Sequence, residues 1–235
     1  MIHAFEYEER YKVSDVSSIQ TILEANGFAK TSEETQSDHW FIPKEIMSPA
    51  EQAQWFDYDG GFALRIREQV KDNRRRTIIT SKRLLQAADH SAMANYEAEL
   101  TFQGMQEVLA PMGQEFDQIV NELATYQNDG RLSLDEGKSL IEKAGRKDYI
   151  VIDKQRSTYS NAAQPEVTAD LDYVPALVDT DIGFAAAIEL EYIGTGTIEE
   201  AKTAVRAISS KLGFEPDEIL AMALPGLAIK YLAVF

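Results

Sequence analysis

Charged residues recur two positions apart in five stretches of this 235-residue chain, and their types could bind both metal ions and phosphate. Three stretches carry acidic pairs and two carry basic pairs: Glu6/Glu8, Glu97/Glu99 and Glu189/Glu191, then Arg65/Arg67 and Lys154/Arg156. Carboxylate oxygens suit Mg²⁺ and Mn²⁺, and guanidinium groups bind phosphate through paired hydrogen bonds. A site that gathers several of these pairs could hold a complex of a metal ion and a polyphosphate.

Each pair lies in a stretch with the alternation of a β-strand, in which residues two apart share a face. The positions between the charges are largely apolar or aromatic, such as Tyr7, Ile66 and Leu190. Each strand therefore has one charged face and one face that needs a hydrophobic cover. A single pair of this kind is usually a solvent-exposed strand face. Five pairs, with acids and bases on different strands, imply an opposite charge or a ligand, because like charges repel.

The elements that would position these pairs are mainly strands. Period-two patterning predicts about eight of them, near residues 3–13, 37–43, 61–69, 76–83, 95–103, 148–159, 166–174 and 184–193. Capping-box spacing predicts helices that begin near Ser17, Ser133 and Thr197, and a further helix covers about 104–126. Strands in this order do not alternate with helices, so the fold class is an antiparallel α+β arrangement. If the charged faces all face water, the strands form a sandwich or an open sheet. If the charged faces meet, the strands form a barrel with a polar lumen and helices outside it.

We expect one domain over 1–235, with a helical insertion at about 104–147. The net charge of −16 argues against nucleic acid or an anionic membrane as a partner, although bases gathered in a cleft can still bind a small anion. The chain has no cysteine, which excludes disulfides and thiol catalysis. The N-terminus lacks the pattern of a secretory signal, and the apolar stretch 219–235 is short for a membrane span. A cytoplasmic location is the expectation.

The order of the motifs resembles that of the CYTH family, the triphosphate tunnel metalloenzymes. This family includes class IV adenylyl cyclases, thiamine triphosphatases and inorganic triphosphatases. The opening run is similar to the family's ExExK start, with Arg10 in place of the lysine. The similarity continues in order through Asp38–Phe41, Ala63–Arg67, Ile79–Lys82, Tyr96–Glu99, Asp153–Arg156, Leu171–Val174 and Ile188–Glu191.

The resemblance implies an eight-stranded antiparallel β-barrel, the triphosphate tunnel, with flanking and inserted helices. It implies Mg²⁺ or Mn²⁺ as cofactor, held by Glu6, Glu8, Glu97, Glu99, Glu189 and Glu191. The residues that would bind substrate are Arg10, Arg65, Arg67, Lys82, Lys154 and Arg156. The catalytic residues would be Glu6, Glu8 and Arg10. Asp172 would remain in the lumen as a structural partner or an additional acid.

The implied activity is metal-dependent hydrolysis of inorganic or organic triphosphate; the substrate would be triphosphate, ATP or thiamine triphosphate. A class IV-type adenylyl cyclase, which makes cyclic AMP and pyrophosphate from ATP, is the alternative within the family. A polyphosphate- or nucleotide-binding module with weak catalysis is a third interpretation, because Arg10 departs from the motif. No nucleic acid or membrane partner is expected, and the protein would be a monomer or a homodimer.

Overall fold

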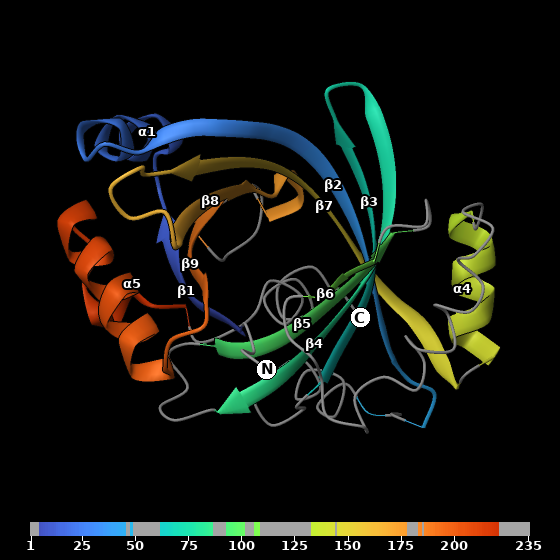
Figure 1. Ribbon diagram of the computed structural model, residues 1–235. Helices are drawn as coiled ribbons and strands as arrows, with labels where there is room; N and C mark the ends of the chain where they lie inside the picture. Colours follow the sequence, from blue (N-terminus) through green and yellow to red (C-terminus); the bar gives the residue numbers. More distant parts are fainter. Residues whose placement is uncertain are drawn as a thin grey trace.

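The computed structural model describes residues 5–45, 48, 62–86, 93–101, 106–108, 133–143, 145–177, 183–184 and 186–220, with side chains for these ranges other than residues 5, 62–63, 81–86, 93–101 and 106–108. The strands are β1 (Phe5–Val13), β2 (Ala29–Pro43), β3 (Phe62–Lys71), β4 (Arg74–Gln86), β5 (Met93–Thr101), β6 (Gln106–Val108), β7 (Arg146–Ser160), β8 (Val167–Tyr173) and β9 (Ala186–Gly194). The helices are α1 (Val16–Ala25), α4 (Leu134–Lys143) and α5 (Ile198–Leu212), with short 3₁₀ turns at Pro175–Leu177 and Pro216–Glu218 (Figure 1).

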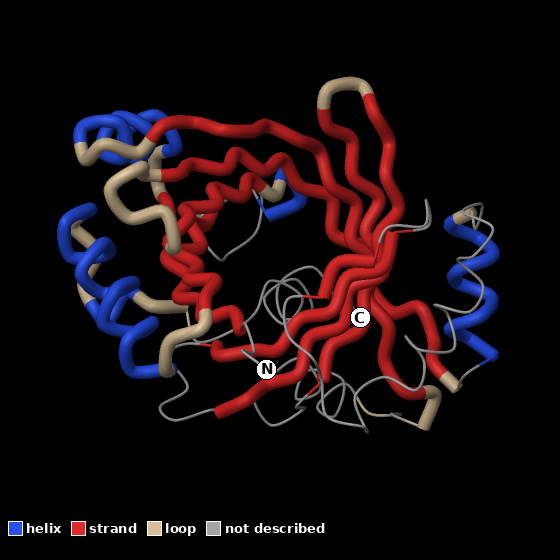
Figure 2. The backbone as a smooth tube through the Cα atoms, viewed as in Figure 1, coloured by secondary structure: helices blue, strands red, loops and turns tan. Residues whose placement is uncertain are grey.

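The described strands form one antiparallel sheet in the order β1-β9-β8-β7-β2-β3-β4-β5-β6. β1 also pairs with β5, with Glu6 opposite Asn95 and Glu8 opposite Met93. The sheet is strongly curved, and its strands wrap around a common interior (Figure 2). The predicted antiparallel α+β class is therefore confirmed.

Helices α1 and α5 cover the apolar side of β1 and β9, which carry two of the three acidic pairs. Tyr7 and Tyr11 of β1 are buried in one hydrophobic cluster with Ile188 and Leu190 of β9 and Val205 of α5. These strand residues alternate with Glu6, Glu8 and Arg10 of β1 and with Glu189 and Glu191 of β9, so these five charged residues point away from the helices. Figure 1 shows α5 alongside β1 and β9, which confirms the prediction that amphipathic helices supply the hydrophobic cover.

Helix α4 lies on another flank of the sheet and packs against β7 and β3 (Figure 1). Its Ile141 is fully buried. Lys138 Nζ donates a hydrogen bond to Asp148 Oδ2 of β7 at 2.7 Å. The helix therefore holds the end of the long β2–β7 pair that lies away from α1 and α5.

Two of the predicted helix starts are confirmed in atomic detail. The Thr197 hydroxyl accepts from the Glu200 backbone N–H at 3.2 Å, and the Glu200 carboxylate accepts from the Thr197 N–H at 2.7 Å. Ser133 and Glu136 form the same reciprocal pair at 3.3 and 2.8 Å. Each pair satisfies two N–H groups that a helix start would otherwise leave without partners.

The predicted start of the first helix is wrong in detail. Asp15 caps α1, and its carboxylate accepts from the backbone N–H groups of Ser17 and Ser18. Ser17 therefore already lies in the first turn, where the predicted capping box with Gln20 cannot form. A carboxylate at this position also interacts favourably with the positive end of the helix dipole.

The predicted helix over about 104–126 is wrong at residues 106–108, which form β6 and pair with β5. Pairing with a neighbouring strand here prevails over the local helical pattern. Residues 109–132 lie outside the described residues, so the boundaries of the insertion at about 104–147 stay a prediction. Helix α4 lies within the C-terminal part of this predicted insertion, which is therefore helical there.

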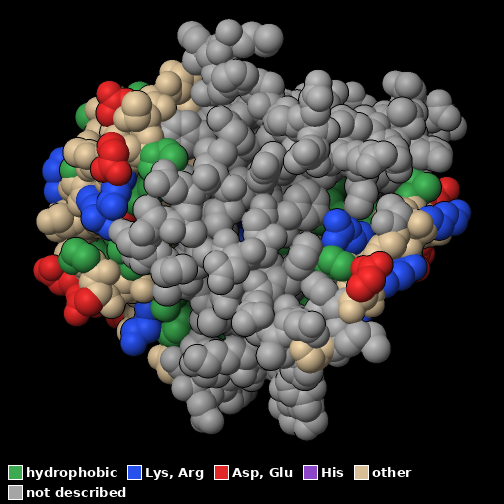
Figure 3. All heavy atoms as spheres, turned by 90° about the horizontal axis from the view of Figure 1, so that it is seen from below, with side chains coloured by type: hydrophobic (Ala, Val, Ile, Leu, Met, Phe, Trp, Pro, Cys, Tyr) green, Lys and Arg blue, Asp and Glu red, His purple; other side chains and the backbone are tan. Residues whose placement is uncertain are grey.

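The described outer surface carries both kinds of charge. On the face in Figure 3, acidic, basic and apolar side chains are mixed along both flanks of the molecule. The described part of that face therefore presents no broad patch of a single sign. None of the described helices is both long and apolar enough to cross a membrane.

Candidate functional site

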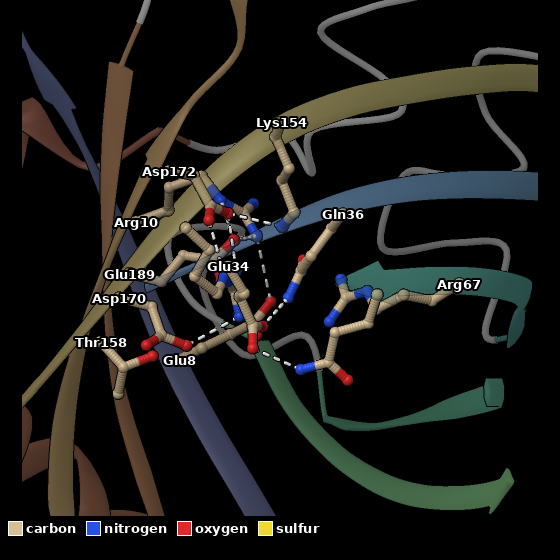
Figure 4. A network of polar contacts seen from close by, with 12 residues as sticks. Glu8, Arg10, Glu34, Gln36, Arg67, Lys154, Thr158, Asp170, Asp172 and Glu189 are labelled. Atoms are coloured by element: carbon tan, nitrogen blue, oxygen red, sulfur yellow. Dashed lines mark hydrogen bonds and ion pairs between the residues drawn. The ribbon is translucent and has the colours of Figure 1, made fainter. Parts of the chain in front are cut away.

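The inward face of the sheet is lined by charged side chains that are almost completely buried. On β1, Glu6, Glu8 and Arg10 are 0%, 5% and 8% exposed. The same alternation gathers charged and polar residues from the neighbouring strands: Glu34, Gln36 and Asp38 of β2, Arg65 and Arg67 of β3, Thr80 of β4, Lys154 and Arg156 of β7, Asp170 and Asp172 of β8, and Glu189 of β9. Figure 4 shows part of this set, with Glu34, Gln36, Arg67, Lys154, Asp170, Asp172 and Glu189 labelled. Buried charges are tolerated only when they are paired, so the pairing defines the site.

Arg156 is the centre of the first set of ion pairs. Its Nε and Nη2 bind the two oxygens of Asp172, both at 2.6 Å, in a two-pronged contact. Its Nη1 donates to Asp170 at 2.7 Å, and its Nη2 also donates to Glu189 at 2.5 Å. Lys154 Nζ reaches Asp172 from the same strand at 2.6 Å. One guanidinium group therefore joins strands β7, β8 and β9.

Asp38 of β2 is the centre of the second set. Arg67 grips its carboxylate through Nε at 2.6 Å and Nη2 at 2.8 Å, and Arg65 approaches it at 3.4 Å. Lys154 Nζ is 4.0 Å from the same carboxylate, which links the two sets. Arg65 also donates to Thr80 of β4 at 3.0 Å. Burial alone would raise the pKa of Asp38, but Arg67 and Arg65 outweigh it and hold that pKa well below its usual range.

Arg10 forms the third set on the β1–β9 pair. It lies directly opposite Glu189, while Glu8 lies opposite Glu191. Arg10 Nε donates to Glu189 at 2.8 Å, and Nη2 contacts both Glu189 and, at 3.4 Å, Glu8. Burial by itself would lower the pKa of Arg10, but the two carboxylates prevail and raise it. Arg10 is therefore a permanent cation between two acids.

Burial and charge push neighbouring titratable groups in opposite directions. Burial opposes ionisation of Asp172, but Arg156 and Lys154 outweigh it and lower the pKa of that carboxyl. For Asp170, burial prevails and raises the pKa. Burial, reinforced by the adjacent Arg156, lowers the pKa of Lys154 to about 8. Lys154 is thus a base whose charge can change just above neutral pH.

The structure brings most of the predicted site residues together around this interior: Glu6, Glu8, Arg10, Arg65, Arg67, Lys154, Arg156 and Glu189. Glu191 occupies an inward position opposite Glu8 and is partly buried. Lys82 lies opposite Glu97, and Glu99 lies opposite Thr80 on the β4–β5 pair. The side chains of Lys82, Glu97 and Glu99 lie outside the described residues, so their roles stay predictions.

Four further residues line the interior for which no role was predicted from the sequence: Glu34, Gln36, Asp38 and Asp170. The signal was present, because these residues repeat the spacing of two in Glu34-x-Gln36-x-Asp38 and Asp170-x-Asp172. The first run combines two acids with an amide, and the second consists of aspartates. Neither is a pair of glutamates or of bases, which were the patterns used to predict the site.

Glu9 is a buried carboxylate that faces the opposite way. It is 0% exposed and lies on the helix-covered side of β1. Its carboxylate accepts from the hydroxyls of Tyr7 at 2.9 Å and Tyr11 at 2.6 Å, and from Arg206 Nε of α5 at 2.9 Å. Glu9 therefore fastens α5 to β1 and is separate from the charged interior.

The sequence matches no protein-family model and no curated protein. The fold does have counterparts among solved structures. The PH1819 protein of Pyrococcus horikoshii is 18% identical with a TM-score of 0.62, over 96% of this chain and 98% of that one. A conserved hypothetical protein of Pyrococcus furiosus is 18% identical with a TM-score of 0.60, over 93% and 97%.

A third counterpart is a Vibrio parahaemolyticus protein proposed to be an adenylate cyclase. It is 14% identical with a TM-score of 0.57, over 95% of this chain and 98% of that chain. The chain shares the fold of these three solved structures. The resemblance noted in the sequence is thereby confirmed for the fold, while the reaction must be argued from the residues inside it.

The carboxylate donors on the β1–β9 pair suit a hard divalent cation. Glu8 lies directly opposite Glu191, and Glu6 is two residues along the same face. Like charges directly opposite each other destabilise a strand pair. Arg10 lies 3.4 Å from Glu8, and a divalent cation bound by Glu8 and Glu191 would offset the repulsion further. Among the described residues no three acidic or histidine side chains are grouped closely enough to hold a metal ion. Waters and substrate oxygens would therefore complete the coordination, as is usual for Mg²⁺.

Proposed function

We propose that the protein is a metal-dependent enzyme that hydrolyses a triphosphate inside a tunnel. The observation that carries this proposal is the burial of Arg10, Arg65, Arg67, Lys154 and Arg156 on one inward face. Five cations in a protein of net charge −16 are concentrated where solvent is nearly excluded. In such an interior, fixed cations can bind a compact polyanion, which competes for them with the carboxylates that already pair with them.

The proposed tunnel is an eight-stranded antiparallel barrel. The pairing of β1 with β5 joins the first and the eighth strands of the sheet order, which supports closure. β6 would then be an additional strand beside β5, outside the ring. A closed ring presents every inward side chain to one lumen, so that bases from β3 and β7 can contact the same chain of phosphates.

The division of labour follows the charges. The bases of β3 and β7 would bind and orient the phosphates, since arginine matches phosphate oxygens in a two-pronged geometry. Glu8 and Glu191 would hold Mg²⁺ or Mn²⁺ together with waters and phosphate oxygens, and Glu6 lies beside them on the same face. When bound, the metal supplies charge neutralisation to phosphoryl transfer. Arg10 is held between Glu8 and Glu189, and its guanidinium group would place a positive charge beside the reacting end of the triphosphate.

The test is an assay with inorganic triphosphate, ATP and thiamine triphosphate, each with Mg²⁺ or Mn²⁺. We expect orthophosphate to be released and activity to be lost in EDTA and restored by the metal. Cyclic AMP with pyrophosphate would instead support an adenylyl cyclase, the function proposed for the Vibrio parahaemolyticus counterpart. Tight metal-dependent binding without turnover would contradict the enzyme and leave a binding module.

The depressed pKa of Lys154 predicts a pH-dependent affinity for the triphosphate. The groups that face its Nζ are Asp172 and Asp38, with Arg156 and Arg67 nearby. Above pH 8 the free protein loses the Lys154 proton, which a bound polyanion would restore. Affinity for a non-hydrolysable ATP analogue should therefore fall about tenfold per pH unit above this pKa, between pH 8 and 9.

The matched variant is Lys154→Arg, because a guanidinium group stays charged over this range and should flatten the profile. Parallel profiles for the two proteins would contradict the assignment. The sign for folding is the reverse. The pKa of Lys154 is lower in the folded protein than in the unfolded chain, so between about pH 8 and its ordinary pKa the unfolded chain binds the extra proton. The free energy of unfolding should therefore rise with pH over this range.

A further inference from the structure

Two buried polar residues of β2, Glu34 and Gln36, lie beside the bases of β3 and β7 and have no role in the proposed hydrolysis. Gln36 is 3% exposed and Glu34 is 8% exposed, and both point into the interior with Arg67 and Lys154 (Figure 4). Gln36 Nε2 donates a hydrogen bond to the Glu34 carboxylate. Gln69 Nε2, from β3, donates to the other oxygen of the same carboxylate. Two amides therefore hold one acid in place.

This arrangement fixes which way the amide of Gln36 faces. An ionised carboxylate only accepts hydrogen bonds, so the NH₂ group must face Glu34 and the carbonyl oxygen must face away. Gln36 Oε1 is buried and receives no hydrogen bond from the described residues. A buried oxygen without a donor is unfavourable and uncommon in native proteins. Oε1 of Gln36 is therefore an acceptor prepared for a donor that the described protein does not supply.

The register places this acceptor among the phosphate-binding bases. Gln36 lies opposite Lys154 on one side and opposite Gln69 on the other, and Glu34 lies opposite Arg156. Phosphate oxygens are acceptors and negatively charged, so they cannot satisfy Gln36 and are repelled by Glu34. A triphosphate alone therefore leaves this part of the interior without a partner.

We propose that Glu34, Gln36 and Gln69 form a subsite for a hydrogen-bond donor on the organic part of the substrate. The inference rests on the proposed function and narrows its substrate class to organic triphosphates that carry a hydroxyl or amino group. The phosphates contact the bases of β3 and β7, and the donor meets Oε1 of Gln36 and the carboxylate of Glu34. A site built to hydrogen-bond a substrate group rejects analogues that lack it, because its own polar groups are then left unpaired.

The test compares three substrates that share the triphosphate: ATP, methyl triphosphate and inorganic triphosphate. Methyl triphosphate is an ester without hydroxyl or amino donors on its organic part. Gln36→Leu is expected to lower kcat/KM for ATP by about tenfold, the effect of one net hydrogen bond, and to leave the other two within about twofold. The exposed, outward-facing Gln155 of β7 supplies the control, and Gln155→Leu should change none of the three.

Glu34→Gln is the second variant and keeps the shape of the side chain. It should lower kcat/KM for ATP and also lower KM for inorganic triphosphate, because a negative charge leaves the interior. Equal losses for all three substrates, or a raised Mg²⁺ requirement in Glu34→Gln, would overturn the subsite. Wild-type protein that turns over no triphosphate would overturn the proposed function instead. Calorimetric Kd values for the same three compounds would then still test the subsite.

Discussion

Arg156→Ala is expected to lower the free energy of unfolding at neutral pH by about 3–5 kcal/mol, a large part of the stability of an ordinary domain. The guanidinium group contacts three buried carboxylates, those of Asp170, Asp172 and Glu189. Without it these acids face one another, and Lys154 remains as a cation beside Asp172. Unfolding in urea, followed by circular dichroism, measures the loss.

Two comparisons separate this effect from a general loss of packing. Arg156→Lys keeps the positive charge but not the two-pronged guanidinium contact with Asp172, so the free energy of unfolding should fall by less than in Arg156→Ala. Arg75→Ala removes an arginine that is 69% exposed beside Glu68, and should change stability by less than about 1 kcal/mol. A similarly small loss in Arg156→Ala would contradict the central role of Arg156.

The destabilisation in Arg156→Ala should also shrink in acid. The pKa of Asp172 is lowered in the folded protein, so the stability that this carboxylate contributes is present above its ordinary pKa and is lost as the pH falls. Protonated carboxyl groups need no cation as a partner, so the difference in the free energy of unfolding between the wild type and the variant becomes smaller. Unfolding curves for both proteins at neutral pH and near pH 3 would test this convergence.

The alternation of the strands made the inward set predictable. In Arg65-x-Arg67 and Lys154-x-Arg156, a spacing of two is a local property of the backbone that needs no knowledge of the partner strand. The intervening apolar residues identify which face the helices cover. The sequence therefore predicted the side of the sheet for these bases, and the structure confirms it.

The extent of β2 was not predictable in the same way. The strand was expected near 37–43, yet it begins at Ala29, because Glu33, Glu34 and Thr35 are polar on both faces and show no alternation. Long antiparallel pairing with β7 makes this stretch a strand. That pairing also brings Asp38 to Lys154, a contact between residues far apart in the sequence.

The ion pairs also show why the interior can be folded before any ligand binds. Asp38 holds Arg67, and Asp172 holds Arg156 and Lys154, so each base already has an acid. A polyanion must then compete with these carboxylates for the same donors. This competition should lower the affinity for the polyanion relative to a cluster of bases without acidic partners. The existing ion pairs also keep the bases oriented, which limits the reorganisation on binding.

Glu8→Gln and Glu191→Gln are each expected to lower kcat by on the order of a hundredfold and to raise the Mg²⁺ or Mn²⁺ concentration needed for half-maximal activity. These two residues face each other across β1 and β9, and a metal ion would relieve their repulsion. An amide keeps the shape and removes the charge that binds the ion. Kinetics over a metal titration measure both quantities.

Glu9→Gln is the matched control for Glu8→Gln. Glu9 is the next residue on β1 and is as deeply buried, but it faces Tyr7, Tyr11 and Arg206 on the helix side. Glu9→Gln should lower thermal stability and leave the metal dependence of the folded enzyme unchanged. If Glu8→Gln and Glu9→Gln shifted the metal requirement equally, the effect would come from the stability of β1 and not from a ligand. The alternation of the strand therefore turns adjacent glutamates into a direct test of which face binds the metal.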